Sequence, residues 1–373
     1  MRPTTKIRLL LVPAALMLAA CDDSDSPFEP DAAHELPAEA PALDETPALA
    51  DQRWADGYAT IDNPTAPSYT PVAEYSYNRT GGRITSQKPA GSTGRYIVTF
   101  AGLSAALGPK STVHVTSAGL ANTYCKPTTG TLVNNKVEIR CIALSSGTAT
   151  NSAFTVVILR KAATRAFAFA NKPTAASYAP AGSGSYNPAG TSRIVRLSAG
   201  NYQVVFNGLG AKLGGKSGHV QVNAVGAGKA WCKATEDWGG NPNLGLLVQC
   251  WTTGGQFVDT KFNLLFQLPA AHLAYAYANS PSVSSYQVDP FWSSNPSGGL
   301  VTVNRIGTGE FTVHWAGSDP LILGLGNVQV TAVGWNSNGT CIISQLSPEG
   351  ALVRCAAANG TPVNEPFSIL LGS

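Results

Sequence analysis

The stretch Gly94-Arg-Tyr-Ile-Val-Thr-Phe100 places large apolar side chains at every second position after a glycine. It returns as Gly200-Asn-Tyr-Gln-Val-Val-Phe206 and again as Gly309-Glu-Phe-Thr-Val-His-Trp315. A period of two puts these side chains on one face of a half-buried strand. Because the stretch recurs after about 105 residues, the chain from residue 53 onward is predicted to contain three copies of one unit.

Other segments keep the same register in all three copies. Most of them alternate apolar and polar residues between Gly, Pro, Asn and Ser clusters, and none has a helical period. The sequence therefore predicts an all-β protein of three tandem antiparallel β-sandwich domains, with immunoglobulin-like or jelly-roll connectivity. Brief joins between the copies predict a stiff rod of three beads. The matching segments are 58–69, 167–178 and 275–286, then 113–116, 220–223 and 328–331, and finally 154–159, 262–267 and 367–371.

The first residues are typical of an export signal. Three basic residues within the first eight positions precede an apolar run that is too short to span a bilayer. The run ends in Leu18-Ala19-Ala20-Cys21, which resembles the lipobox of bacterial lipoproteins. That resemblance implies cleavage before Cys21, a lipid on its thiol, and a protein held on the bacterial cell envelope at the periplasm or cell surface. A plain signal peptide is the alternative.

Residues 22–52 contain ten acidic side chains, five prolines and no Lys or Arg. Such a segment buries too little apolar surface to offset its ordering entropy, so it is predicted to be a disordered tether. The expected organisation is a signal peptide at 1–20, an acidic, Pro-rich tether at 21–52, and β-sandwich repeats at 53–162, 163–270 and 271–373.

The charge of the chain is unevenly distributed. The formal net charge of the whole chain is +3, but 22 basic and 12 acidic residues follow the tether, which leaves +10 there. The excess lies in residues 53–272, so an anionic glycan or protein partner is favoured through long-range attraction. With only 13% charged residues in the chain, a nucleic-acid partner is not expected.

The number and placement of the cysteines agree with three repeats and with export to an oxidising compartment. Apart from Cys21 there are six, and each copy holds one pair, so a bridge within each copy is the simplest arrangement. Disulfides persist in oxidising compartments, which agrees with export. Close CxxC pairs or neighbouring histidines, as a thiolate metal site requires, do not occur. The expected bridges are Cys125–Cys141, Cys232–Cys250 and Cys341–Cys355.

No motif in the sequence predicts an enzyme, a cofactor or a metal site. Residues 210–217 match the spacing of a phosphate-binding loop, but a strand pattern follows where that loop requires a helix, so a connecting loop is expected. His34, His114, His219, His272 and His314 occupy unrelated places and are expected to be exposed. The polar positions that recur three times are expected to set turns and caps: Asn78, Asn187 and Asn295, with Asn151, Asp259 and Asn364.

A binding site should then lie where the copies differ. In the cysteine loop of the second copy, an exposed Trp238 beside Glu236 and Asp237 is predicted to stack on a sugar ring or an aromatic partner. Trp231 and Trp251 flank the bridge and are expected to pack on it.

The repeat pattern resembles repeats of uncharacterised secreted bacterial proteins, and more faintly the jelly-roll module of the C1q and tumour necrosis factor group. The hypothesis is a monomeric, lipid-anchored, non-enzymatic binding or adhesion module and stalk for an envelope glycan or protein. The alternatives are a secreted hydrolase with an inter-domain site and a purely structural spacer.

Overall fold

The recurring stretch forms a strand in each copy. The computed structural model describes residues 53–119, 122–180, 182–270, 273–317, 326–335, 337–347 and 350–372, without the side chains of residues 236, 237 and 347. The glycine before each of these strands has a positive φ and donates its N–H to an Asn or Asp side chain, which confirms the predicted caps. The strands are β5 (Arg95–Phe100), β13 (Asn201–Phe206) and β22 (Glu310–Trp315).

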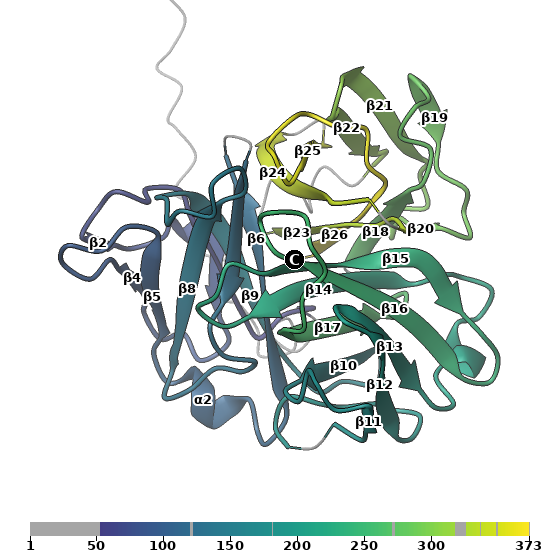
Figure 1. Cartoon of the computed structure of the whole chain (residues 1–373), viewed down its shortest axis with the longest axis horizontal. Helices are drawn as coiled ribbons and strands as arrows, with labels where there is room; N and C mark the ends of the chain where they lie inside the picture. Colours follow the sequence, from purple (N-terminus) through teal and green to yellow (C-terminus); the bar gives the residue numbers. More distant parts are fainter. Residues whose placement is uncertain are drawn as a thin grey trace, which may run out of the picture. The chain divides into compact units, whose positions relative to one another are not determined.

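Strands dominate all three repeats (Figure 1). The remaining elements of the first repeat are β1 (Gly57–Ile61), β2 (Ser68–Tyr69), η1 (Ala73–Tyr75), β3 (Ser76–Asn78), β4 (Ile84–Gln87), α2 (Leu103–Ala106), β6 (Ser111–Ala118), β7 (Thr123–Pro127), β8 (Lys136–Ala143) and β9 (Ala153–Arg160). Those of the second are β10 (Arg165–Ala170), β11 (Ser177–Tyr178), β12 (Ser192–Ser198), η2 (Gly210–Lys212), β14 (His219–Val225), β15 (Trp231–Gly239), β16 (Leu244–Trp251) and β17 (Lys261–Gln267). Those of the third are β18 (Leu273–Ala278), β19 (Ser285–Gln287), β20 (Ser293–Ser294), β21 (Val301–Gly307), β23 (Asn327–Ala332), β24 (Gly339–Ser347), β25 (Gly350–Ala357) and β26 (Phe367–Gly372).

The strand order is the same in each repeat. The first strand pairs with the last, which pairs with a middle strand: β1-β9-β6, β10-β17-β14 and β18-β26-β23. Apart from β3 and β20, which pair with β1 and β18, the other strands form the orders β2-β4-β5-β8-β7, β11-β12-β13-β16-β15 and β19-β21-β22-β25-β24. These pairs are antiparallel, so the all-β, antiparallel prediction is confirmed. A strand follows the 210–217 segment, as expected of a connecting loop.

Each repeat buries apolar side chains from both of its strand sets. In the first repeat, Val98 and Ile139 from one set pack with Val113 and Val156 from the other. The predicted bridges are confirmed, and each joins two neighbouring strands: Cys125–Cys141, Cys232–Cys250 and Cys341–Cys355. Disulfides of this kind indicate an oxidising compartment. No helix in the described residues is long and apolar enough to cross a membrane.

The three repeats contact one another in a closed ring. Strand β7 of the first contacts β14 of the second, β15 of the second contacts β23 of the third, and β24 of the third contacts β6 of the first. These are equivalent strands, so the same contact is repeated until the ring closes. Strands β6, β14 and β23 lie side by side in the middle (Figure 1). The predicted rod is wrong, because a rod would leave the first and third repeats apart, whereas the described residues of all three repeats belong to one compact unit.

A shared apolar cluster, which we call the central cluster, explains this arrangement. It contains the equivalent aromatic side chains Tyr58, Phe167 and Tyr275, together with Val157, Leu265 and Leu370 of the closing strands. The closing strands are therefore buried on both faces, one inside their own repeat and one against the other repeats. A strand buried on both faces requires the nearly continuous apolar run seen there.

Polar side chains line the contact between the middle strands. Thr116 donates to Gln329 over 2.9 Å, and Gln221 donates to the Val330 carbonyl over 3.0 Å. His114 Nδ1 lies 3.2 Å from Asn223 Oδ1. The predicted exposure of the strand histidines is wrong for His114 and His219, which are fully buried, because their strands face other repeats. His34, His272 and Cys21 lie outside the described residues.

Candidate anion-binding site

A cavity of about 360 Å³ lies where the first repeat joins the second. It is built from the residues just before β1, the end of β9, the join that follows it, and the start of β10. The join is held in place by backbone hydrogen bonds from Leu268 N to Thr164 O and from Lys161 N to Lys110 O. The lining residues are Arg53, Trp54, Asp56, Arg79, Arg160, Lys161, Ala162, Thr164, Arg165, Gln267 and Ala270.

The cavity wall has a strong positive excess. Among the described lining residues, five are Arg or Lys and one, Asp56, carries a carboxylate. That carboxylate is buried and accepts hydrogen bonds from the Arg160 backbone N–H at 2.8 Å and from Arg79 at 3.4 Å, and it pairs with Arg160 Nε at 3.0 Å. One carboxylate cannot neutralise five cations, so the cavity attracts anions.

Arg165 is the one buried side chain among these five cations. Its side chain is buried, and burial lowers the pKa of its guanidinium to about 10, although Asp56 opposes that shift. Its Nη2 donates to the Trp54 carbonyl, whereas Nε and Nη1 have no hydrogen-bond partner among the described residues. Unpaired buried donors are costly, and these two nitrogens are closed to solvent in this conformation, so the guanidinium would have to turn towards the cavity to bond an oxyanion there.

Two lining residues, Trp54 and Gln267, are fixed by their contacts with the rest of the protein. Trp54 belongs to the central cluster and packs so closely on Gly372 that a Cβ at that glycine would lie 2.1 Å from the indole ring. Gln267 is anchored by its Nε2, which donates to the carbonyls of Thr164 and Leu268. The site is therefore held between the second repeat and the central cluster.

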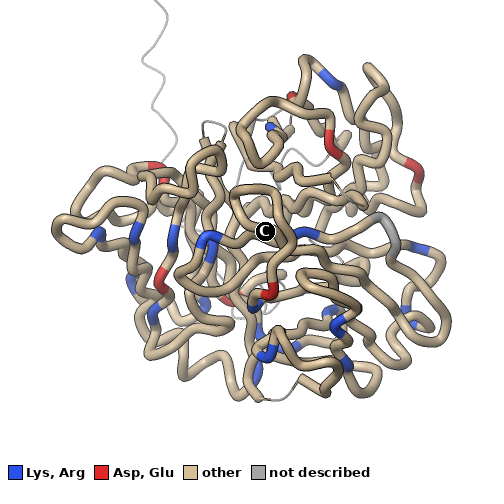
Figure 2. Tube along the Cα trace, in the orientation of Figure 1, with Lys and Arg blue, Asp and Glu red and all other residues tan. Residues whose placement is uncertain are grey.

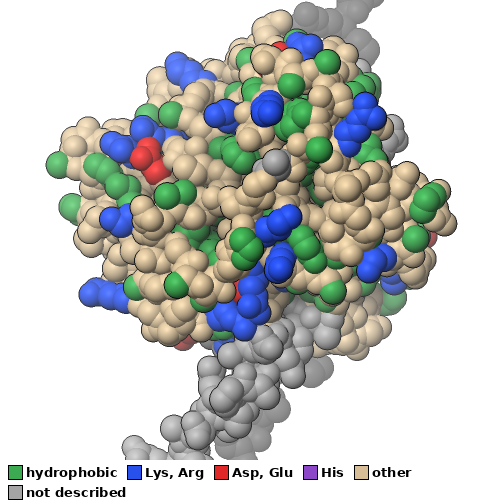
Figure 3. All heavy atoms as spheres, turned by 90° about the horizontal axis from the view of Figure 1, so that it is seen from below, with side chains coloured by type: hydrophobic (Ala, Val, Ile, Leu, Met, Phe, Trp, Pro, Cys, Tyr) green, Lys and Arg blue, Asp and Glu red, His purple; other side chains and the backbone are tan. Residues whose placement is uncertain are grey.

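The wider surface agrees with this charge distribution. Lys and Arg residues outnumber Asp and Glu over the first two repeats, as the colouring of Figure 2 shows. From below, basic side chains gather in the middle of the face (Figure 3). A larger cavity of about 520 Å³ on the third repeat has no Lys, Arg, Asp or Glu among its described lining residues.

The predicted site around Trp238 assumed an exposed ring, and this assumption is wrong. The Trp238 ring is only 8% exposed, because it packs against Tyr277 and Trp292 of the third repeat, and its Nε1 donates to the Ser217 carbonyl over 3.1 Å. The side chains of Glu236 and Asp237 lie outside the described ones. Trp231 and Trp251 stack on each other beside the bridge.

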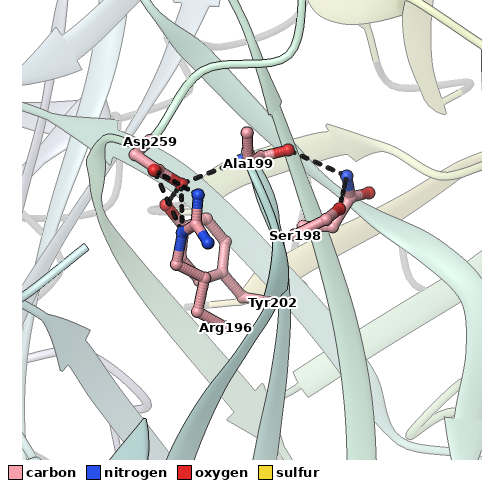
Figure 4. A network of polar contacts seen from close by, with 7 residues as sticks. Arg196, Ser198, Ala199, Tyr202 and Asp259 are labelled. Carbon is pink, nitrogen blue, oxygen red and sulfur yellow. Dashed lines mark hydrogen bonds and ion pairs between the residues drawn. The ribbon is translucent and has the colours of Figure 1, made fainter. Parts of the chain in front are cut away.

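Asp259 forms a polar network that is structural. It accepts from Arg196 through both carboxylate oxygens at 2.8 to 3.0 Å, from Tyr202 at 2.8 Å and from the Gly200 N–H at 3.0 Å (Figure 4). The hydrogen bond from Arg196 is the main reason why the Asp259 pKa is lowered. Asn151 and Asn364 cap the equivalent glycines, so this position serves the fold of every repeat.

Sequence reasoning missed the anion site because it treated residues 160–165 only as a connection. A signal was present, since three of those six residues are Arg or Lys and Arg53 begins the folded region directly after an acidic segment. The burial of Arg165 was not readable from the sequence, because it depends on the second repeat turning back against the first.

Comparison with protein-family models, with curated proteins and with solved structures finds no match. In the described part of the chain, no group of three or more His, Cys, Asp or Glu side chains could hold a metal ion.

Proposed function

We propose that this chain is a lipid-anchored, extracytoplasmic protein without enzymatic activity that binds an anionic envelope glycan. Its head consists of three β-sandwich repeats arranged in a ring. The partner carries phosphate or carboxylate groups, which are the anions that guanidinium groups bind best. The proposed anchor is a lipid on Cys21, and residues 22–52 connect it to the head.

Jelly-roll connectivity is the form of sandwich that we propose for each repeat. The first and last strands of each repeat pair within one sheet, as β1 and β9 do. Immunoglobulin constant-type domains keep their first and last strands in different sheets. The pairing therefore favours a jelly roll.

The observation that carries the binding proposal is the buried guanidinium of Arg165 on the wall of a cavity, because two of its nitrogens have no hydrogen-bond partner among the described residues. Natural proteins rarely leave buried charged donors unpaired without a reason. The surrounding cations would draw in an anion from solution, and Arg165 would bond to it once its guanidinium turns towards the cavity.

Titration of the purified full chain with pyrophosphate and with a polyuronate tests this proposal. We expect binding that weakens steeply between about 50 and 300 mM salt, since exposed charges are screened over that range. Lys161→Glu, an exposed change at the cavity, should weaken binding at least tenfold, or about 1.4 kcal/mol. Lys261→Glu, an exposed change of the same type on β17, is the control and should bind normally. Equal loss in both variants, or no binding of either probe, would overturn the proposal.

A hydrolase with a site between two repeats is the second candidate. It is favoured by a cluster of Lys, Ser and Glu side chains from the second and third repeats. Lys233 of the second repeat donates to Glu365 and Ser337 of the third, and Ser337 donates to Glu365. A Ser–Lys hydrolase needs the lysine to take the serine proton, whereas here Lys233 is the donor. Ester hydrolysis that disappears in Ser337→Ala would favour the hydrolase.

A further inference from the structure

A second cavity of about 360 Å³ lies between the second and third repeats. It shares no lining residue with the basic cavity. Its volume falls at the lower end of the range for small-molecule sites. The second repeat contributes Trp251, Gly255 and Phe257, and the third contributes Ser337, Asn338, Gly339, Val363 and Glu365.

One wall of this cavity is an aromatic stack. Trp231 and Trp251 stack with ring centroids 4.8 Å apart, and Phe257 continues the stack 5.3 Å from Trp251. The two tryptophans are buried, whereas Phe257 is 41% exposed. A rigid stack that ends in an exposed ring offers a flat apolar face to a ligand at little entropic cost.

The opposite wall carries hydrogen-bond donors and acceptors, and Glu365, the one charged side chain among its described lining residues, is paired with Lys233. Glu365 is buried, and its ion pair with Lys233 balances the two charges. Among the described residues, the partners of Glu365 all use Oε1, and none donates to Oε2. The Asn338 amide is half-buried and makes no side-chain hydrogen bond within the described part of the chain. These two groups can accept from hydroxyls and donate to them.

We propose that this cavity binds one ring of a neutral saccharide. The ring's C–H face would stack on Phe257, and its hydroxyls would bond to Glu365 Oε2 and to the Asn338 amide. The balanced charge of the wall excludes a preference for anions, in contrast to the basic cavity. This site goes beyond the proposed function and does not depend on it.

Titration of the full chain with chitobiose and with maltose, followed by tryptophan fluorescence and calorimetry, tests the saccharide site. The stack contains two tryptophans, so ligand contact should change the emission. Phe257→Ala should weaken binding about tenfold, the effect expected from the loss of one ring contact. Phe291→Ala removes a ring that is 44% exposed and lies outside the cavity lining, and it is the control. Asn338→Ala should also weaken binding, although Asn338 belongs to no aromatic stack.

The outcomes separate this site from the basic cavity. Saccharide binding that falls in Phe257→Ala but persists in Lys161→Glu and at high salt supports the proposal, whatever happens to anion binding. Three results would overturn it. The first is no binding of either disaccharide at about 10 mM, which is tenfold above a Kd of about 1 mM. The others are equal binding by wild type and Phe257→Ala, and binding that is lost in Lys161→Glu.

Discussion

The junction between the first and second repeats and the junction between the second and third are built on the same positions but use different chemistry. Lys126 and Lys233 each follow a disulfide cysteine, and each is 1% exposed. Lys126 donates to the Ala230 carbonyl over 2.6 Å, and burial lowers its pKa to about 7. Lys233 instead meets the carboxylate of Glu365. The fold therefore places a buried lysine at the same position in both repeats, and whether a carboxylate balances its charge depends on the residues of the neighbouring repeat.

The third junction shows that the charge is not required by the architecture. Ile342 of the third repeat occupies the position equivalent to the two lysines and is also buried. An apolar side chain therefore satisfies the same contact, so each lysine can be removed to test what its charge contributes.

The largest effect is expected at the second junction. Glu365→Gln removes one charged partner of the buried Lys233 and should lower the free energy of unfolding by about 3–5 kcal/mol. Lys233→Met combined with Glu365→Gln should recover most of that loss, because neither member of this pair then carries a charge. Denaturant unfolding at pH 7 measures both variants. A loss under about 1 kcal/mol in the single variant would contradict a balanced buried pair.

The two buried histidines predict that the stability of the folded protein falls at acidic pH. Burial lowers the pKa of His114 and His219 to about 3, whereas the unfolded chain takes up these protons near pH 6.5. Stability should therefore fall as the pH drops from 6.5 towards 3, by about 1.4 kcal/mol per pH unit for each histidine.

His114→Gln tests this prediction with a natural replacement, because Gln221 and Gln329 occupy the equivalent positions. Between pH 6.5 and 4 the variant should lose about 3 kcal/mol less than the wild type. His314→Gln, on a strand outside the ring's centre, is the control. Identical pH profiles for wild type and His114→Gln would contradict the assignment.

Lys126 should have a smaller effect on stability, and this effect should appear at alkaline pH. Its folded pKa of about 7 lies below the unfolded value of about 10.5, so stability should rise as the pH rises through this window. From pH 7.5 to 9 the wild type should gain about 2 kcal/mol that Lys126→Met does not gain. Lys261→Met, at an exposed position, should keep the wild-type profile. Unfolding at several pH values gives the comparison.

The smallest effect is expected at the cap of the second repeat. Asp259→Asn loses the pair with Arg196 but retains an acceptor for the Gly200 N–H, as Asn151 and Asn364 do in their repeats. The lowered Asp259 pKa means that its contribution is present above its ordinary pKa and is lost as the pH falls through the lowered value. Thermal unfolding should show a smaller loss for Asp259→Asn than for Asp259→Ala.

The strands and the bridges could be predicted because they depend on local chemistry, and the capping positions because they recur in three copies. The alternation in β5, β13 and β22 requires one buried face. The Asn or Asp side chain that caps each preceding glycine lies 55 to 59 residues further along the chain, so its partner was visible only in the structure. A bridge within each repeat follows from pairing neighbouring strands. The candidate site was not predicted, since Arg165 and Trp54 come together only when the second repeat packs against the first.

The closing strand of each repeat carries a sequence signal of the ring. Phe154-Thr-Val-Val-Ile-Leu159 is almost continuously apolar, whereas a strand at the surface of a free sandwich needs a polar residue at every second position. Val156 and Ile158 face the core of the first repeat, and Val157 and Leu159 face the central cluster. The second apolar face required a partner, and the sequence could not say which one.

The sequence by itself determined a β unit repeated three times, with its turns and its internal disulfides, because these follow from residue period, spacing and backbone preference. The tertiary structure alone decided that the units close into a ring, that two histidines and two lysines become buried, and that cavities form at the joins. Those features depend on which surfaces meet, and contacts between residues more than a hundred positions apart leave no local pattern in the chain.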